Sequence, residues 1–152
     1  MPVLNRIWIL TLADKFLPKK RAEIMSHISG KETKPEIMVR NFLYHNGFRY
    51  RKNVSALHGK PDIVLTKYKT IIFVHGCFWH QHKNCPKSKL PDTHREFWDD
   101  KLTKSIKRDI NNEKRLLAGG WNVIIIWQCE INNRTKFINR MDLLEKQLRS
   151  VK

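Results

Sequence analysis

Long hydrophobic runs are missing from this chain of 152 residues. A helix that crosses a bilayer needs about 18 to 20 consecutive apolar residues, and the longest apolar run here, from Trp121 to Trp127, has the length of a strand. We therefore expect no membrane-spanning segment and no membrane partner. The chain also lacks internal repeats and low-complexity linkers, and its length suits one compact domain with its own core.

Cysteine is scarce as well, because the chain holds only three. A small and odd number does not build a disulfide framework, so a reducing, cytosolic compartment fits better. Residues 1–12 are largely apolar, but Arg6 interrupts the run and no small-residue cleavage site follows, unlike in a secretory signal. We expect residues 1–12 to be an N-terminal extension of uncertain status and residues 13–152 to form a single domain.

Acidic residues are few compared with basic ones. The chain carries 14 Asp and Glu against 30 Lys and Arg, which gives a formal net charge of +16. Such an excess indicates an anionic partner, most commonly nucleic acid for a folded domain. The alternative is a solvated basic surface without chemistry. The positive charges are dispersed in short clusters, which is typical of a folded face that follows phosphates.

Hydrophobic periodicity predicts the element order α-α-β-β-β-loop-α-β-α, a mixed α/β sheet flanked by helices. The predicted helices span residues 18–29, 34–45, 93–118 and 135–150, and the predicted strands span residues 48–52, 62–66, 70–75 and 121–127. Strands 62–66 and 70–75 are expected to pair as an antiparallel hairpin.

Several finer features of these elements are also predicted. Thr33 and Glu36 have the spacing of a capping box, and Asp92 or Thr93 is available to cap the long helix. Strand 121–127 is expected to be buried, with both of its tryptophans in the core. The last helix is expected to face inward with Phe137, Ile138, Met141, Leu144 and Leu148.

All three cysteines belong to one candidate metal site. Cys77, His82 and Cys85 lie in an irregular, polar segment, and Cys129 follows strand 121–127. Three thiols and one imidazole complete a tetrahedral Cys₃His zinc site, with His75 or His80 as alternative ligands. The alternative of inert buried thiols suits the polar neighbours of Cys85 poorly. We predict one structural zinc ion that holds this loop to the end of the strand.

A second candidate site combines a carboxylate with aromatic side chains. Asp62 opens one strand of the hairpin beside the end of its partner strand, where Mg²⁺ can bind through carboxylate, carbonyl and phosphate oxygens. A turn-capping role is the alternative for Asp62. Aromatic side chains lie nearby in the chain, and they can act as wedges between DNA bases or pack in the core: Phe78, Trp79, Phe97 and Trp98.

These motifs together carry a resemblance to a known family. The segments LHGKPDIVLTKYKTIIFVHGCFWHQHKNCPKSKLPDTHREFWDDKL and GGWNVIIIWQCEI, with TKPE upstream, resemble the very short patch repair (Vsr) DNA mismatch endonucleases. The resemblance covers roughly residues 13–132. It implies a restriction-endonuclease-like mixed sheet with a structural zinc ion, and an enzyme that nicks one DNA strand 5′ to the T of a T:G mismatch formed by deamination of 5-methylcytosine.

The resemblance also implies roles for individual residues. Asp62 would bind Mg²⁺ directly together with the backbone carbonyl of Val74, in a site for two catalytic Mg²⁺ ions. Glu36 and His75 would hold water molecules at the metal, and His80 would be the general base, for which imidazole is suited near neutral pH. The remaining roles concern zinc (Cys77, His82, Cys85, Cys129) and DNA (Phe78, Trp79 and Trp98 as intercalating rings, Lys101 as a base-reading residue).

Two positions depart from the family pattern. The zinc loop has one residue more between His82 and Cys85, and Ser105 stands where the family commonly has an asparagine that reads the mismatched pair. Ser105 offers one hydroxyl instead of an amide, so the sequence context of recognition stays open.

Three functions are therefore compared: a mismatch endonuclease, a restriction-type or broader-specificity endonuclease, and a non-catalytic, zinc-stabilised DNA-binding module. For the first we expect a cytoplasmic, nucleoid-associated bacterial monomer that binds double-stranded DNA with a T:G mismatch. A functional link to a cytosine-5 DNA methyltransferase and other mismatch-repair proteins is expected with it.

Overall fold

The structure is a computed structural model, and it describes residues 19–20 and 32–151. The chain divides into two compact units, Met1–Glu32 and Thr33–Lys152. In the first unit Lys19 and Lys20 are helical, within the helix predicted over residues 18–29. The rest of that helix and residues 1–12 lie outside the described residues.

The second unit holds the elements in the predicted order. They are α2 (Lys34–His45), β1 (Arg51–Lys52), β2 (Ile63–Leu65), β3 (Thr70–His75), α3 (Arg95–Ala118), β4 (Asn122–Trp127) and α4 (Arg134–Ser150). Short 3-10 turns lie at Thr66–Tyr68, Pro86–Ser88 and Gln128–Ile131. No helix among the described residues has the length and apolar character needed to cross a membrane.

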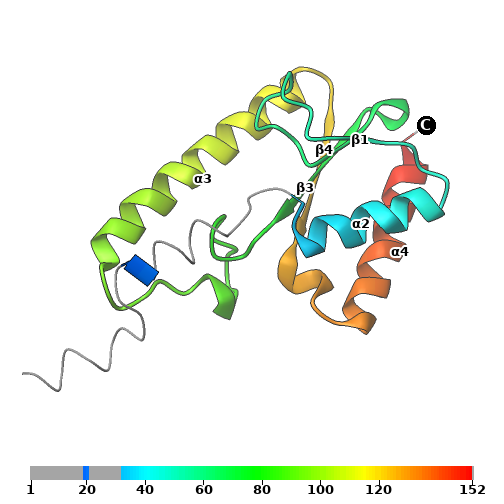
Figure 1. Cartoon of the computed structure of the whole chain (residues 1–152). Helices are drawn as coiled ribbons and strands as arrows, with labels where there is room; N and C mark the ends of the chain where they lie inside the picture. Colours follow the sequence, from blue (N-terminus) through cyan, green and yellow to red (C-terminus); the bar gives the residue numbers. More distant parts are fainter. Residues whose placement is uncertain (1–18, 21–31, 152) are drawn as a thin grey trace, which may run out of the picture. The chain divides into compact units, whose positions relative to one another are not determined.

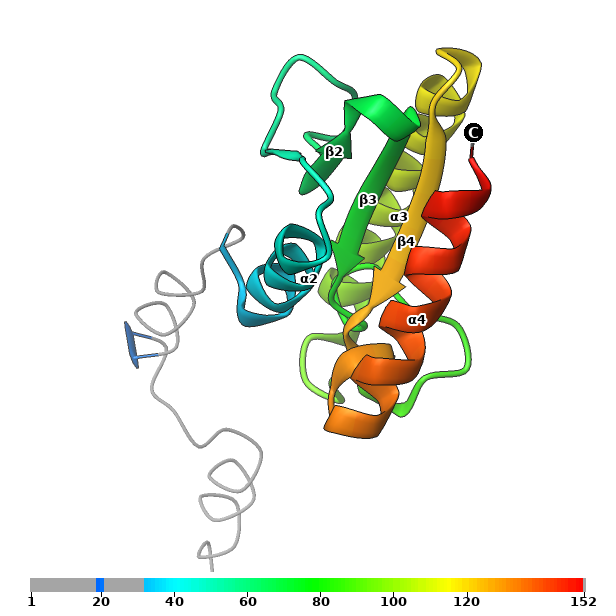
Figure 2. The ribbon, with the colours of Figure 1, turned by 90° about the vertical axis from the view of Figure 1, so that its right-hand side faces the viewer.

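The four strands form one mixed sheet in the order β1-β2-β3-β4. β2 and β3 pair antiparallel, as predicted for the hairpin, whereas β3 and β4 pair parallel. The connection between these parallel strands contains α3. Helix α3 covers one face of the sheet, and α2 and α4 cover the other (Figures 1 and 2).

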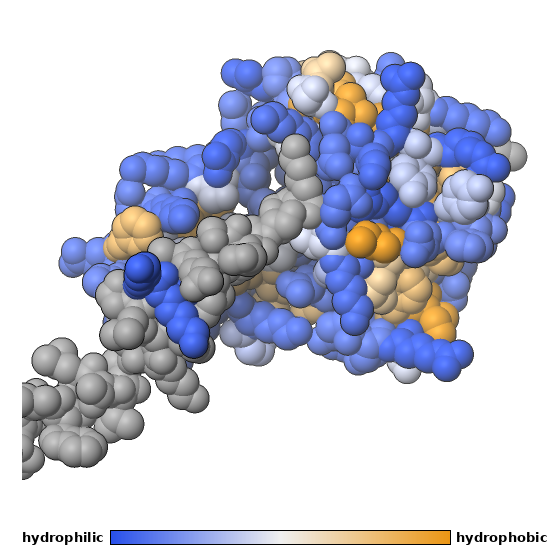
Figure 3. Space-filling model, viewed as in Figure 1, coloured by the Kyte–Doolittle hydropathy of each residue, from blue (hydrophilic) through white to orange (hydrophobic). Residues whose placement is uncertain are grey.

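Alternating side chains of the strands supply two cores, one on each face of the sheet. The larger core packs α2 and α4 against residues such as Ile72, Val74, Ile124 and Ile126. The smaller core packs Leu116 of α3 against Val64 and Ile71, with half-buried side chains around them. The mixed α/β architecture predicted from periodicity is therefore confirmed, and the face shown in Figure 3 is mostly hydrophilic with separate hydrophobic patches.

The N-terminal caps of α2 and α3 were both predicted from short sequence signals, and only the cap of α2 is confirmed. Thr33 caps α2 as predicted, because its hydroxyl accepts a hydrogen bond from the Glu36 backbone N–H (3.4 Å) and donates one to Glu36 Oε1 (2.7 Å). The predicted cap of α3 is wrong. That helix starts at Arg95 after His94, whose positive φ of 52° breaks the helical path, so neither Asp92 nor Thr93 adjoins the first turn.

Two predictions of burial are also wrong. Ile138 is 47% exposed, since the buried stripe of α4 follows Met141, Leu144 and Leu148 and leaves Ile138 beside it. In β4 only Ile124 and Ile126 are buried, because this strand lies at the edge of the described sheet with a neighbour on one side.

Candidate active site and metal centre

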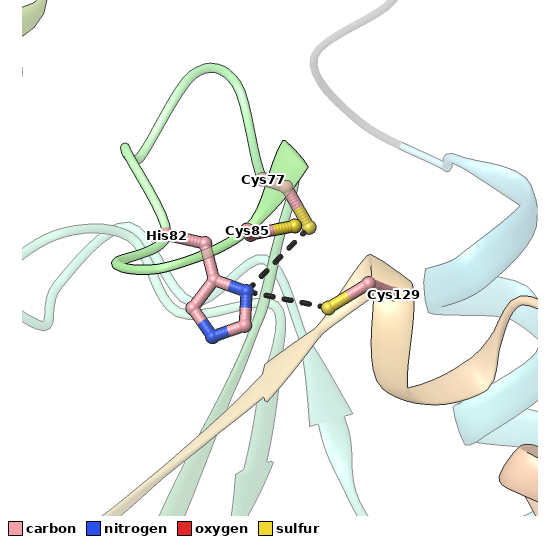
Figure 4. A group of neighbouring side chains, drawn as sticks. All are labelled: Cys77, His82, Cys85 and Cys129. Atoms are coloured by element: carbon pink, nitrogen blue, oxygen red, sulfur yellow. Dashed lines mark hydrogen bonds between the residues drawn. The ribbon is translucent and has the colours of Figure 1, made fainter. Parts of the chain in front are cut away.

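The Cys/His group lies where the parallel strands β3 and β4 end. Cys77, His82 and Cys85 come from the segment after β3, and Cys129 comes from the 3-10 turn after β4. Their side chains point toward one another (Figure 4). His82 Nδ1 lies 3.2 Å from Cys129 Sγ and 3.8 Å from Cys77 Sγ, and all four ligand atoms lie within 4.8 Å of one another.

This donor set fits a zinc ion. Zinc bonds of about 2.3 Å to sulfur and about 2.1 Å to nitrogen, at tetrahedral angles, place two ligand atoms roughly 3.6 Å apart. Burial, with the nearby sulfurs of Cys77 and Cys85, raises the pKa of the Cys129 thiol to about 12, so the three thiols resist ionising together without a cation. The group thus assembles as predicted from spacing, and neither His75 nor His80 takes part in it.

Ser88 stabilises the loop that carries His82 and Cys85. Its hydroxyl lies within hydrogen-bond distance of the carbonyls of His82 (2.8 Å) and Cys85 (2.7 Å). Between these two carbonyls the chain turns through Asn84 at a φ of 57°, a conformation that asparagine tolerates better than most residues. The loop with the extra residue therefore still brings both side chains to the group.

Asp62 lies directly before β2 and opposite the end of β3. Its Oδ2 accepts a hydrogen bond of 2.8 Å from the backbone N–H of Val74. Burial, helped by the charge of Glu36, raises the pKa of this carboxyl to about 6, although the hydrogen bond from Val74 and the charges of His80 and Arg40 oppose the rise. Asp62 is thus a carboxylate whose charge is poorly compensated by the protein alone.

Glu36 and Arg40 add a buried pair of charges from α2. Both residues are less than 5% exposed, and Arg40 Nη2 lies 4.0 Å from Glu36 Oε2. The effect of Glu36 on the pKa of Asp62 shows that the two carboxylates are close enough to repel each other. A cation between or beside them lowers that repulsion.

His80 is held by a carboxylate that the sequence analysis did not single out. His80 Nδ1 lies 2.6 Å from Oδ2 of Asp109 on α3, and its ring stacks on that of His75 with centroids 3.7 Å apart and planes 4° apart. Burial and the neighbouring His80 lower the pKa of His75 to about 4, although Asp109 opposes this. Asp109 appeared in sequence as one more acidic residue of an amphipathic helix, with no spacing signal toward His80.

The bond to Asp109 leaves one imidazole nitrogen of His80 for chemistry. When Nδ1–H donates a hydrogen bond to a carboxylate, the proton stays on Nδ1 and the Nε2 lone pair is available to take a proton from another group. Asp62 and His80 thus place a carboxylate, which is a group able to bind a cation, near an imidazole, which is a group able to transfer a proton.

Four aromatic rings form a cluster beside this site, here called the aromatic cluster. Phe78 and Trp79 come from the segment after β3, and Phe97 and Trp98 come from the start of α3. Their ring centroids are 5.2 to 5.9 Å apart in edge-to-face contacts. None of the four belongs to either hydrophobic core of the described residues, so the core-packing alternative does not hold for them.

Lys101 and Ser105 continue from the aromatic cluster along α3. Lys101 Nζ lies 5.3 to 5.7 Å from the rings of Trp79, Phe97 and Trp98. Ser105 is half-buried and lies 3.4 Å from Nη2 of Arg108. Since Lys101, Ser105 and Asp109 are spaced by four residues, they share one face of the helix.

Known proteins resemble this chain along most of its length. A family model described as DNA mismatch endonuclease Vsr matches residues 13–87. The Type II nicking enzyme V.NmeAIP of Neisseria meningitidis serogroup A is 46% identical, over 91% of this chain and 98% of its own length. V.XorIIP of Xanthomonas oryzae is 36% identical, over 92% and 97%. The DNA mismatch endonuclease Vsr of Escherichia coli K12 is 37% identical, over 82% and 80%.

The raised pKa of Asp62 predicts how stability depends on pH without magnesium. Since the pKa is 3.8 when exposed and about 6 in the fold, the folded state binds this proton more tightly than the unfolded chain. The proton bound to Asp62 therefore stabilises the folded state. This contribution to the free energy of unfolding is complete below pH 4 and is lost as pH rises through 6. Asp62→Asn, which keeps an oxygen for Val74, should therefore raise the unfolding free energy at pH 7 by about 1 to 3 kcal/mol.

Urea unfolding at pH 4.5 and pH 7, without added divalent cation, measures this gain. The gain should shrink at the lower pH, and added Mg²⁺ should stabilise the wild type more than Asp62→Asn. Asp142→Asn, a change at an exposed position of α4, is the control. Equal effects of the two substitutions at pH 7 would contradict the assignment.

Proposed function

This chain belongs to the Vsr family of DNA mismatch endonucleases, and from that membership we propose that it is an Mg²⁺-dependent enzyme that nicks one strand 5′ to the T of a T:G mismatch. As a member it is an endodeoxyribonuclease with a restriction-endonuclease-like core. Its substrate is duplex DNA in which deamination of 5-methylcytosine has left T opposite G. The enzyme works as a monomer, since a mismatch has no two-fold symmetry to match.

One observation carries the proposal: a cation-binding carboxylate and an oriented imidazole meet at one end of the sheet. Asp62 is half-buried and poorly compensated, and its pKa responds to the charge of His80, so the two groups are near each other. His80 in turn is bonded to Asp109. Hydrolysis of a phosphodiester needs both kinds of group, one at the phosphate and one at the attacking water.

The acidic groups of the site fit magnesium. Asp62 and the carbonyl of Val74 would hold the ion, and Glu36 and His75 would bind water at it, an arrangement that suits Mg²⁺ because this ion keeps several waters. Among the described residues, the Cys/His group is the one set of three or more metal-binding side chains whose ligand atoms cluster closely, consistent with few direct protein ligands here. Bound Mg²⁺ supplies charge stabilisation at the scissile phosphate.

His80 removes the proton from the attacking water. Asp109 accepts a hydrogen bond from Nδ1–H of His80, so Nε2 takes up the proton of the water as the water oxygen bonds to phosphorus. The bond between phosphorus and the 3′-oxygen breaks, and that oxygen gains a proton from solvent. The products carry 5′-phosphate and 3′-hydroxyl ends. His75 stays neutral at pH 7 because of its low pKa, so the stacked ring adds no charge that would repel the proton on His80.

Recognition of DNA falls to the aromatic cluster and to one face of α3. Phe78, Trp79 and Trp98 intercalate beside the mismatch, which unstacks the base step, and Lys101 and Ser105 face the bases in the groove. The net charge of +16 supplies the sequence-independent attraction to phosphates. The mismatch by its chemistry links this enzyme to a cytosine-5 DNA methyltransferase and to other mismatch-repair proteins.

A strand-resolved nicking assay tests the function. Full-length protein, Asp62→Asn and the control Asp142→Asn are incubated with Mg²⁺ and labelled duplexes that are matched or contain T:G, with randomised flanking sequence. We expect nicking of the T:G duplex alone, and a loss of at least about 10³-fold in Asp62→Asn with DNA affinity retained. Equal cutting of matched DNA would indicate a restriction-type enzyme, and binding without cutting would indicate a binding module.

Asp109→Asn tests the orientation of His80. An asparagine amide can donate to Nδ1 and thereby favour the tautomer that has its proton on Nε2, so we expect the nicking rate to fall by about 10² to 10⁴-fold. DNA affinity should change little. Asp99→Asn, an exposed change on the same helix, is the control in single-turnover kinetics. A loss of less than threefold in Asp109→Asn would refute the role.

Cys129→Ala tests the zinc assignment. Four protein ligands leave no open position for water, so the zinc is structural. We expect the variant to lose bound zinc and to melt about 5 °C lower or more, with activity falling as a secondary effect. Elemental analysis and thermal unfolding measure this, with His58→Ala in an exposed loop as control. Unchanged zinc content and melting temperature would refute the assignment.

A further inference from the structure

A continuous chain of ring contacts joins the Cys/His group to His80. The ring of His82 stacks on Trp127 with centroids 4.1 Å apart and planes 8° apart. Trp127 meets His75 edge-on at 5.3 Å and 70°. His75 stacks on His80 at 3.7 Å, and His80 is bonded to Asp109. Trp127 is thus the indole between a metal-ligand imidazole and the paired imidazoles of the active site.

The pairing of the strands fixes this position of Trp127. His75 and Trp127 are direct partners in the parallel register of β3 and β4, and each is the last residue of its strand. Their neighbours Val74 and Ile126 belong to the core on the α2 and α4 face. Since side chains alternate along a strand, His75 and Trp127 lie on the opposite face, which α3 covers.

Trp127 differs from a core tryptophan, which is the role expected from sequence. It is half-buried and is absent from both hydrophobic cores of the described part of the chain. Trp121, just before the other end of β4, shows the contrast. It is half-buried too, but it packs against the core around Leu116, so the prediction is confirmed for Trp121 and wrong for Trp127.

We propose that Trp127 is a positioning residue for strand nicking, which holds His75, and through it His80, in a fixed place against the Cys/His group. This inference rests on the function proposed above. The bond to Asp109 fixes one edge of the His80 ring, and the stacked His75 fixes its plane. Besides His80, the ring of His75 contacts Phe73 at 5.5 Å and Trp127. Removal of the indole therefore takes away one of the two aromatic contacts that hold the His75 ring in place.

The size of the effect follows from the geometry that general-base catalysis requires. The base must lie within hydrogen-bond reach of the attacking water, and a displacement of about 1 Å can cost about 10²-fold in rate. A phenylalanine ring at position 127 retains part of the contacts with His75 and His82. An aliphatic side chain loses both the stacking on His82 and the edge-on contact with His75.

The experiment compares full-length Trp127→Leu and Trp127→Phe with Trp121→Leu, a matched loss of indole near the other end of the same strand. We measure zinc content, melting temperature, DNA affinity and the single-turnover nicking rate on the T:G duplex. The ring resonances of His75 and His80 in ¹⁵N-histidine-labelled, DNA-free protein report their positions independently of activity.

We expect Trp127→Leu to keep its zinc, to bind DNA within about twofold of wild type, and to nick about 30 to 100-fold more slowly. Its His75 and His80 resonances should shift. Trp127→Phe should recover the rate to within about fivefold. Trp121→Leu should lower the melting temperature but nick within about twofold of wild type, with both resonances in place.

Three results would overturn the proposal. These are a rate for Trp127→Leu within threefold of wild type, an equal loss of rate in Trp121→Leu, and a loss of zinc that accompanies the loss of rate in Trp127→Leu. If the wild type nicks no duplex, the proposed function fails by itself, and unshifted resonances in Trp127→Leu then overturn the positioning role separately.

Discussion

The parallel register of β3 and β4 is the constraint on which both sites depend. It places His75 opposite Trp127, and Cys77 and Cys129 each lie two residues beyond this pair. One pairing therefore brings together two thiols of the Cys/His group and the stacked rings of the candidate active site. Because side chains alternate along a strand, a slip of one residue would turn Trp127 away from His75. The buried isoleucines of β4, Ile124 and Ile126, resist such a slip, since they would leave the core.

Charge is distributed unevenly over the molecule. The chain as a whole carries +16, which favours binding to an anionic polymer, yet the carboxylates Glu36, Asp62 and Asp109 gather around the site. Burial, together with the charge of Glu36, raises the pKa of Asp62. A site of this kind destabilises the protein without a cation and favours binding of a cation when one is present. Without a cation, the ionised carboxylate of Asp62 thus lowers the stability of the fold at the place where the proposed chemistry needs a cation ligand.

The aromatic cluster shows a similar division between stability and function. Its rings contact one another and Lys101 but take no part in the cores of the described residues. Phe97 is 59% exposed. The other three rings are half-buried, and the edge-to-face contacts assemble all four before any partner binds.

The sequence by itself determined the features that short spacings encode. These include the order of the elements, the cap at Thr33, the hairpin, and the members of the Cys/His group, since three cysteines leave few ways to complete a four-ligand site. Only the tertiary structure decided which side chains meet across elements. Asp109 lies 29 residues after His80 and contacts it because α3 packs over the ends of β3 and β4. Trp127 lies against His75 and His82 instead of the core because β4 ends there. Hydrophobic periodicity reports which face of an element is buried, but the partner of a polar or aromatic side chain depends on how the elements pack in three dimensions.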